Sequence, residues 1–359
     1  MLLAPEIIDE RNTSRKDVNG VHSAQSALLR DEDAKLSRSR PQLSSEEMRW
    51  GVILAGGDGS RLRSMSHLIY GDDRPKQFCR FLGRQTLLEQ TRQRTARSIR
   101  AEQTIIALTE AHRKFYEDDL AASVSPRLVQ PHNRGTAPPI ILSLLHIATQ
   151  TPGALVALFP SDHYYSNEAA FTASLESAFR LADTHPDSIV LLGAQPRGAE
   201  VDLGWLDLGR SAGENLFRVR GFEEKPSHEA AERLLRSGAL WNTFVMVGTT
   251  MALLWMALVT LPELVTTLDE SLPLLGQNGE LRVPSSLYDA IPRTDFSSQV
   301  LVPNAHRLLA LRLQQLDWYD LGLPDRVISA VSARGQDRPP WIHAWEIARR
   351  STRDPIFLS

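Results

Sequence analysis

The sequence predicts a Rossmann-like α/β fold, in which a mostly parallel β-sheet carries helices on both faces. Short apolar runs alternate with segments of helical spacing between residues 51 and 192. The run ALVALF at 154–159 is apolar throughout, which is typical of a strand buried on both faces. With 42% hydrophobic residues, the 359-residue chain can also bury a large core.

The elements of this first region follow in order from their spacing. Each strand is a short apolar run, and the strands are expected at Gly51–Leu54, Thr104–Leu108, Leu128–Val129, Ala154–Phe159 and Ser188–Leu192. Each helix repeats apolar residues three or four positions apart, and the helices are expected at Thr86–Ser98, Ala111–Ala122, Thr136–Ala148 and Glu168–Asp183.

After Gly193 the pattern changes to shorter strands around one helix. We expect strands at Gly204–Leu208, Phe217–Phe222 and Trp241–Val247, a helix at His228–Ser237, and a buried helix at Thr249–Leu261. This arrangement predicts a smaller mixed lobe beside the sheet, which could close a second pocket.

The ends of the chain differ in composition from its middle. Residues 1–47 are polar and include the charged run RDEDAKLSRSR, so they are predicted to be a disordered leader. Residues 48–330 are predicted to form the folded domain. Residues 331–359 are rich in Pro and Arg and are predicted to be a C-terminal appendage.

Charge and cysteine content limit the classes of partner. A net charge of −3 argues against bulk electrostatic capture of nucleic acid. Cys79 is the only cysteine, so no internal disulfide can form and a cytoplasmic location is expected. No secretory signal is visible, and the run from Met251 to Leu261 is too short to span a bilayer, so no membrane partner is expected.

A glycine-rich loop follows the first strand. Gly56, Gly57 and Gly59 lie within four residues in LAGGDGSRL, with Arg61 close behind and Lys76 in PKQF. Glycines let backbone N–H groups approach a ligand, and the two cationic side chains suit a polyphosphate. The loop therefore predicts a cradle for a nucleoside triphosphate.

Other phosphate motifs fit this loop less well. A dinucleotide fingerprint would need a third glycine where Leu62 stands, and no G-K-S/T sequence of a P-loop is present. A plain tight turn is the remaining alternative, and the nearby Arg61 and Lys76 disfavour it.

Four further motifs carry polar groups near predicted strand ends. Asp162 in FPSDH and Asp320 in DWYDLG are candidate ligands for Mg²⁺, although an aspartate after a strand is also a common helix cap. Glu224 and Lys225 in FEEKP could instead form a surface ion pair. Asn242 in WNTF suits either sugar hydroxyls or ordinary strand packing.

Taken in order, these motifs give the chain a family resemblance. LAGGDGSRL, RPKQF, QPHNRGTAPPI, FPSDH, FEEKP, WNTF and DWYDLG follow one another as in the sugar-phosphate nucleotidyltransferases, and most closely as in their mannose-1-phosphate guanylyltransferase branch. The resemblance covers about 50–327. It implies a GT-A-like nucleotidyltransferase fold over 48–330, with the smaller lobe binding the sugar.

The resemblance also implies roles for individual residues. The nucleotide would be bound by Leu54, Ala55, Gly56, Gly57, Gly59, Arg134, Thr136 and Ala137. Catalysis would rest on Arg61, Lys76, Asp162 and Lys225, and Mg²⁺ on Asp162 and Asp320. The sugar would be bound by Gly204, Glu224 and Asn242.

The implied reaction is transfer of GMP from GTP to mannose 1-phosphate, with GDP-mannose and pyrophosphate as products. The attacking phosphate is already an oxyanion at pH 7, so positioning and charge neutralisation suffice. The expected partners are thus a nucleoside triphosphate and a sugar 1-phosphate, and a homodimer is one possible assembly. A non-catalytic sugar-nucleotide-binding or regulatory paralogue is the alternative function. A glycosyltransferase is a third possible function, but the D-x-D metal-binding motif that is usual in glycosyltransferases is missing from this chain at Asp162.

The chain departs from the family pattern at four places. An insert at Tyr70–Asp73 brings two acidic residues, and Gly135 stands where the pattern has Asn. Phe244 replaces a glycine of the sugar site, and Asp202-Leu203-Gly204-Trp205 replaces a Gly-Tyr-Gly-Tyr pattern. The identity of the sugar is therefore less secure than the reaction type.

Overall fold

One ten-stranded sheet organises the part of the chain that the computed structural model describes, namely residues 44, 46–272, 280–335 and 338–351. Most of the leader expected at residues 1–47 lies outside these residues. The strand order is β10-β3-β2-β1-β4-β9-β6-β11-β8-β7. The strands are β1 (Arg49–Leu54), β2 (Thr104–Thr109), β3 (Arg127–Gln130), β4 (Leu155–Pro160), β6 (Ile189–Ala194), β7 (Gly204–Gly213), β8 (Leu216–Glu224), β9 (Leu240–Thr249), β10 (Glu280–Arg282) and β11 (Leu308–Arg312).

The sheet is parallel on one side and mixed on the other. The pairings from β10 through β3, β2 and β1 to β4 are parallel, as is β6–β11. β9 runs antiparallel to β4 and β6, and β8 runs antiparallel to β11 and β7. The α/β class is confirmed, but β7, β8 and β9 continue the same sheet instead of forming a separate lobe. The alternation of apolar and polar residues along a strand predicts which face of the strand is buried, but it does not predict which strand pairs with it.

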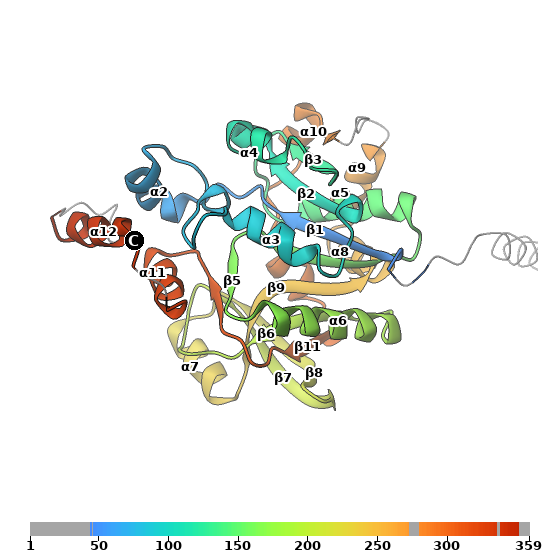
Figure 1. The fold of residues 1–359 in the computed structure, drawn as a ribbon. Helices are drawn as coiled ribbons and strands as arrows, with labels where there is room; N and C mark the ends of the chain where they lie inside the picture. The colour runs from blue at the N-terminus through green and yellow to red at the C-terminus, as the bar shows by residue number, and fades with distance from the viewer. Residues whose placement is uncertain (1–43, 45, 273–279, 336–337, 352–359) are drawn as a thin grey trace, which may run out of the picture. The chain divides into compact units, whose positions relative to one another are not determined.

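Helices cover both faces of the sheet (Figure 1). Successive side chains of a strand point to opposite faces, so Val52 and Ile53 belong to different core clusters. The Val52 side is covered by α5 (Ala137–Gln150), α8 (Thr250–Thr260), α9 (Pro262–Glu270) and α10 (Ser285–Ala290). The Ile53 side is covered by α3 (Leu87–Thr95), α4 (Arg113–Leu120), α6 (Glu168–Thr184) and α7 (His228–Arg236).

Side-chain caps fix where several of these helices begin. Thr86 and Glu89 form a capping box at the start of α3, with reciprocal bonds of 2.6 and 3.1 Å between side chains and backbone N–H groups. Asn167 caps α6 by accepting from the Ala170 N–H at 3.1 Å. Both helices lie on the face of the sheet turned to the viewer in Figure 1.

A third core cluster lies beyond the carboxyl end of β1. It joins α2 (Arg63–Tyr70), α11 (Pro324–Ala333) and α12 (Pro340–Ser351) at the left of Figure 1. Ile342 and Trp345 of α12 are buried there with Met65 of α2. The described part of the segment expected as an appendage therefore packs into the same unit. A short sheet of β5 (His163–Tyr165) and β12 (Trp318–Asp320) lies beside this cluster.

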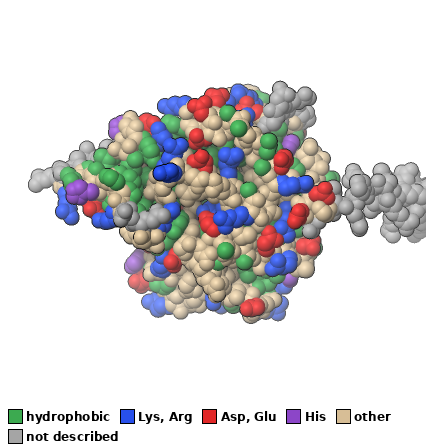
Figure 2. Space-filling model, in the orientation of Figure 1, with side chains coloured by type: hydrophobic (Ala, Val, Ile, Leu, Met, Phe, Trp, Pro, Cys, Tyr) green, Lys and Arg blue, Asp and Glu red, His purple; other side chains and the backbone are tan. Residues whose placement is uncertain are grey.

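α8 is buried on one face only, which corrects the expectation of a buried helix. Met251 and Trp255 are 72% and 40% exposed, and Leu258 and Val259 are exposed as well. No single helix of the described residues is both long and apolar enough to cross a membrane, although α8 and α9, bent by 120°, pass that test together. The surface shows acidic and basic side chains interspersed over the face in Figure 2, in keeping with the small net charge.

Candidate active site

The predicted site residues gather at one edge of the sheet. This edge is formed by the carboxyl ends of β1, β4 and β8 and by the starts of β7 and β9. A cavity of about 840 Å³ opens there. Its lining includes most of the predicted residues, namely Leu54, Gly56, Gly57, Arg61, Lys76, Thr136, Asp162, Gly204, Glu224, Lys225, Asn242 and Asp320.

The glycine loop is held in shape by its neighbours. Ala55, which is fully buried, donates its N–H to the Ala107 carbonyl at 2.8 Å. The buried amide of Gln77 donates to the carbonyls of Ala55 and Gly57 at 2.9 and 2.8 Å. Gly59 adopts a φ of 60°, and a Cβ there would lie 2.8 Å from the backbone nitrogen of Lys76. Only glycine satisfies both constraints at Gly59.

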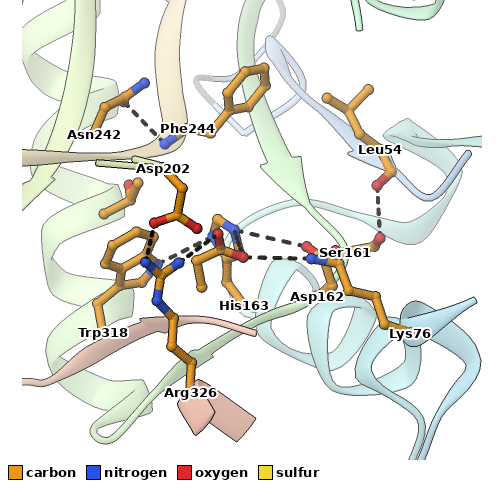
Figure 3. Close-up of polar contacts among 12 residues, drawn as sticks. Leu54, Lys76, Ser161, Asp162, His163, Asp202, Asn242, Phe244, Trp318 and Arg326 are labelled. Atoms are coloured by element: carbon orange, nitrogen blue, oxygen red, sulfur yellow. Dashed lines mark hydrogen bonds and ion pairs between the residues drawn. The ribbon is translucent and has the colours of Figure 1, made fainter. Parts of the chain in front are cut away.

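Lys76 lies between the two predicted metal ligands, and the nearer of them, Asp162, is labelled beside it in Figure 3. Its Nζ is 2.8 Å from Oδ2 of Asp162 and 3.5 Å from Oδ1 of Asp320. Burial lowers the pKa of the Lys76 ammonium, but the two carboxylates outweigh burial and hold that pKa above its ordinary value. Burial also raises the pKa of Asp320, but the surrounding charged side chains, Lys76 first among them, together more than reverse this, so that the pKa falls to about 2. Lys76 and Asp320 are therefore both ionised at neutral pH.

His163 is a second buried group beside these carboxylates. The Trp318 indole N–H donates to its Nδ1 at 3.2 Å, which leaves the proton of the neutral ring on Nε2. Nε2 lies 3.8 Å from Asp162 and 3.7 Å from Asp320. Burial lowers the pKa of His163 below its ordinary value, against the pull of the two carboxylates. We therefore expect a neutral imidazole that faces both aspartates.

Asp202 connects two arginines at the rim of the cavity. Nη1 of Arg61 lies 3.0 Å from Oδ2 of Asp202, and Arg326 contacts the other oxygen of the same carboxylate. Arg326 also bonds Glu200 at 2.6 Å and approaches Asp320 at 3.5 Å. A chain of alternating charges thus runs from Arg61 through Asp202 and Arg326 to Asp320. Asp202 and Arg326, the middle pair of this chain, are labelled in Figure 3.

The predicted sugar-binding residues lie on β7, β8 and β9. Glu224 is largely buried, and burial raises its pKa to about 7, although Lys225 at 3.8 Å opposes the shift. Gly204 pairs with Glu224, and a Cβ there would lie 2.7 Å from the Glu224 carboxylate. Asn242 accepts the N–H of Phe244 at 3.1 Å through its side-chain oxygen.

Two non-glycine residues of this region adopt left-handed backbone conformations. Lys225 has a φ of 52° and Phe244 a φ of 61°. Phe244 stands where the family pattern has glycine, so the backbone conformation is that of glycine while the side chain adds a ring to the cavity wall.

The predicted nucleotide-binding residues Arg134, Thr136 and Ala137 have two kinds of surroundings. Thr136 lines the cavity, and its hydroxyl donates to Asp295 at 3.0 Å. Arg134 instead donates to the Tyr288 carbonyl at 2.9 Å, and Ala137 donates its N–H to the Thr294 carbonyl at 3.1 Å. Neither of these two lines the cavity, nor do Ala55 and Gly59. Gly135 has a φ of 88° and would place a Cβ 2.2 Å from the Thr294 oxygen, which explains the departure from Asn at this position.

Both aspartates of the acidic insert have polar partners close by in the sequence. Asp72 pairs with Arg74 at 2.8 Å, and Asp73 lies 3.1 Å from His67. Neither aspartate lines the cavity. The two acidic side chains of the insert therefore lie outside the wall of the cavity.

The donor set at the centre of the site fits Mg²⁺. The carboxylates of Asp162 and Asp320 are largely buried and face the same point, which the Lys76 ammonium group occupies. Oxygen ligands suit Mg²⁺, which keeps several waters and is often completed by substrate phosphates. No group of three or more His, Cys, Asp and Glu side chains arranged for a metal occurs among the described residues, so the protein would supply these two ligands alone.

Sequence reasoning missed several residues of the site. Gln77 and His163 lie inside the motifs PKQF and FPSDH, where polar side chains between apolar ones were the available signal. Asp202 lies in the DLGW segment, where this chain departs from the family's Gly-Tyr-Gly-Tyr pattern. Arg326 carried no signal, because its contacts with Asp202 and Asp320 depend on how α11 packs.

Comparisons with known proteins agree with this geometry. A family model described as nucleotidyl transferase matches residues 50–335. The chain is 33% identical over 196 residues to the xanthan biosynthesis protein XanB of Xanthomonas campestris pv. campestris, and 31% identical over 201 residues to a mannose-1-phosphate guanylyltransferase of Klebsiella pneumoniae. Each match covers 54% of this chain but only 40% and 41% of those relatives.

Solved structures give the same fold. A Thermus thermophilus protein, described as mannose-1-phosphate geranyltransferase, superposes with a TM-score of 0.69 at 26% identity and covers 81% of this chain and 80% of its own. A Helicobacter pylori protein described as mannose-6-phosphate isomerase reaches a TM-score of 0.62 at 20% identity, over 76% of this chain and 99% of its own, which supports the fold alone.

Proposed function

Because this chain belongs to the nucleotidyl transferase family, we propose that it transfers GMP from GTP to mannose 1-phosphate, giving GDP-mannose and pyrophosphate. One observation carries the proposal. The Lys76 ammonium lies between Asp162 and Asp320 in a cavity that the glycine loop and the Glu224, Lys225 and Asn242 side chains also line. The relatives named for mannose-1-phosphate chemistry favour this pair of substrates.

The proposed reaction needs no proton transfer. A phosphate oxygen of the sugar 1-phosphate forms a bond to the α-phosphorus of GTP, and the bond from that phosphorus to the bridging oxygen breaks. Pyrophosphate leaves with the electron pair. Since both reactants are anions, the chief tasks of the protein are to hold them in line and to neutralise their charge.

Three cations of the cavity can divide this work. Lys76 would neutralise the α-phosphate under attack, Arg61 would bind the leaving β- and γ-phosphates, and Lys225 would bind the sugar phosphate. When bound at Asp162 and Asp320, Mg²⁺ would supply further positive charge to the triphosphate. Lys76 must shift from its bond to Asp162 to reach a substrate phosphate, while Glu224 and Asn242 would orient the sugar hydroxyls.

A substrate panel tests the proposal. The protein with Mg²⁺ is offered GTP, ATP, UTP, CTP or dTTP with mannose 1-phosphate or glucose 1-phosphate, and pyrophosphate release is measured. We expect release with GTP and mannose 1-phosphate. Release with UTP or dTTP but not GTP would keep the chemistry and reject the substrate. If the protein binds nucleotide but releases pyrophosphate with no pair of substrates, the proposed enzyme activity is wrong and a non-catalytic paralogue is the better interpretation.

A lysine variant tests whether the Lys76 ammonium group, which lies between Asp162 and Asp320, takes part in the reaction. Lys76→Met should lower kcat by about 10²–10³-fold, the usual effect of removing one group that stabilises a developing charge. Lys114→Met is the matched control, because Lys114 is exposed and packs over Phe115 outside the cavity. Equal activity of the two variants would remove Lys76 from the reaction.

A further inference from the structure

A second cavity, of about 770 Å³, lies apart from the one described above. Its walls come from the loop before α3, from α3 itself, from β5 and from the end of α11. None of its lining residues lines the first cavity. Its volume is within the usual range for a small-molecule site, which extends from about 300 to 1,000 Å³.

The charges on this cavity do not cancel. Four arginines line it, Arg84, Arg94, Arg97 and Arg334, together with one carboxylate, Glu168. Glu168 forms an ion pair with Arg94, whose Nε and Nη2 lie 2.9 and 2.7 Å from the Glu168 carboxylate oxygens. The Arg94 side chain is only 2% exposed. This pair is neutral and structural, so it leaves three guanidinium groups facing the cavity without a compensating charge from its walls.

The three remaining arginines have no carboxylate partner among the residues that the structure describes. Within the described part of the chain neither Arg84 nor Arg97 takes part in an ion pair, and both residues are exposed. Arg334 donates to the backbone carbonyl of Leu82, a neutral acceptor, and its Cζ lies 6.0 Å from the centre of the Tyr164 ring. Three guanidinium groups on one concave surface create a positive potential that attracts phosphate, and their planar donors match its oxygens.

The rest of the wall is polar as well. The amides of Gln85, Gln90 and Gln93 and the hydroxyl of Ser166 border the same space. Such groups can bond the hydroxyls of an organic ligand, whereas a bare phosphate would leave most of the volume unfilled. The chemistry thus favours a sugar phosphate or another small phosphorylated molecule.

Two elements lead from this cavity to the first one. β5 lines the second cavity through Tyr164 and Tyr165 and pairs with β12, with His163 opposite Asp320. At the start of α11, Arg326 contacts Asp320, and at its end Arg334 reaches the second cavity. A ligand that orders Arg334 or β5 would therefore act on elements that hold the central carboxylates.

We propose that the second cavity binds a small phosphorylated molecule through Arg84, Arg97 and Arg334, and that this molecule is an effector of the site at Lys76. The binding part is independent of the proposed function. The effector part rests on that function, because it needs a reaction to report it.

Calorimetry with glucose 6-phosphate and with inorganic phosphate tests the binding part. We expect the double variant Arg84→Gln/Arg97→Gln to bind glucose 6-phosphate at least about tenfold more weakly than wild type. Arg180→Gln/Arg236→Gln, which removes two exposed arginines on α6 and α7, should bind like wild type. Arg61→Gln should also leave this binding intact.

Four results would overturn or narrow the proposal. Equal binding by the cavity variant and its control would remove the site, and loss of binding in Arg61→Gln would move it to the first cavity. Tight binding of inorganic phosphate, unchanged by the sugar, would overturn the sugar-phosphate class. For the effector part, glucose 6-phosphate should change the rate of pyrophosphate release in wild type and not in the cavity variant. Binding without any change in rate would overturn that part and leave the site standing.

Discussion

The glycine loop after β1 contributes to the same cavity as two other positions, Lys225 directly after β8 and Phe244 within β9, yet the chain builds them in different ways. At the loop, the left-handed residue is glycine, Gly59, and the buried Gln77 amide donates to the loop carbonyls. Lys225 and Phe244 are also left-handed, and their side chains make that conformation costly. The loop is thus relaxed, whereas Lys225 and Phe244 each store strain of about 1–3 kcal/mol. Strain of this kind persists where the surrounding structure and the function require it, so we expect the two regions to respond differently to substitution.

The largest effect is expected at the carboxylates that the two regions share. Asp162→Asn should lower the rate of pyrophosphate release by about 10³-fold, because it removes a charge that the Lys76 ammonium and the proposed Mg²⁺ both need. The variant should fold normally, since the Asn side chain is isosteric. Asp183→Asn, at an exposed position of α6, is the control. Wild-type rates for Asp162→Asn at all Mg²⁺ concentrations would remove Asp162 from the reaction.

A pair of substitutions tests the contrast in backbone strain. Gly59→Ala should lower the free energy of unfolding by about 2 kcal/mol, because the methyl group meets the Lys76 nitrogen and φ is positive. Phe244→Gly should cost less than about 1 kcal/mol, because relief of strain offsets the lost contacts of a partly buried ring. Urea unfolding of both variants measures the difference. A cost of more than about 3 kcal/mol for Phe244→Gly, the usual value for losing a buried Phe, would show that the backbone at Phe244 is not strained.

The same contrast explains which parts of the molecule the sequence predicts. A loop built on glycines is visible in the sequence, because the residue type itself reports the backbone conformation. The positions of β1 to β4 follow from apolar runs for a similar reason. The place of β9 between β4 and β6 depends on long-range pairing, which residue patterns do not encode. The same holds for Arg326, since only the packing of α11 brings it to Asp202. The strain at Lys225 and Phe244 was also hidden, because neither residue type signals a left-handed conformation.

Titration of Glu224, the last residue of β8, gives an effect on stability of similar size. Burial raises its pKa to about 7 in the folded state, against a value of 4.5 in the unfolded chain. Between these values the folded protein holds the proton and the unfolded chain does not. The contribution of Glu224 to stability is therefore complete below pH 4.5 and is lost as the pH rises to about 7, with a total on the order of 1–3 kcal/mol. Glu224→Gln should remove this slope from the pH profile of the unfolding free energy.

The control for this profile is Glu223→Gln, which changes the exposed neighbour of Glu224. It should keep the slope between pH 4.5 and about 7. If both variants keep it, Glu224 titrates at an ordinary pKa and the burial of its carboxyl group has no consequence for stability.

The smallest effect is expected at Asp202, where this chain departs from the family pattern. Asp202 holds the Arg61 guanidinium at 3.0 Å, and the triphosphate proposed to bind Arg61 must compete with that carboxylate. Asp202→Asn should therefore lower the KM for the nucleotide by about two- to fivefold, since exposed ion pairs contribute at most about 1 kcal/mol. The change should leave kcat within about twofold. Glu200→Gln is the matched control, because Glu200 bonds Arg326 but not Arg61. A higher KM for Asp202→Asn would mean that Asp202 positions Arg61 for the nucleotide instead of competing for it.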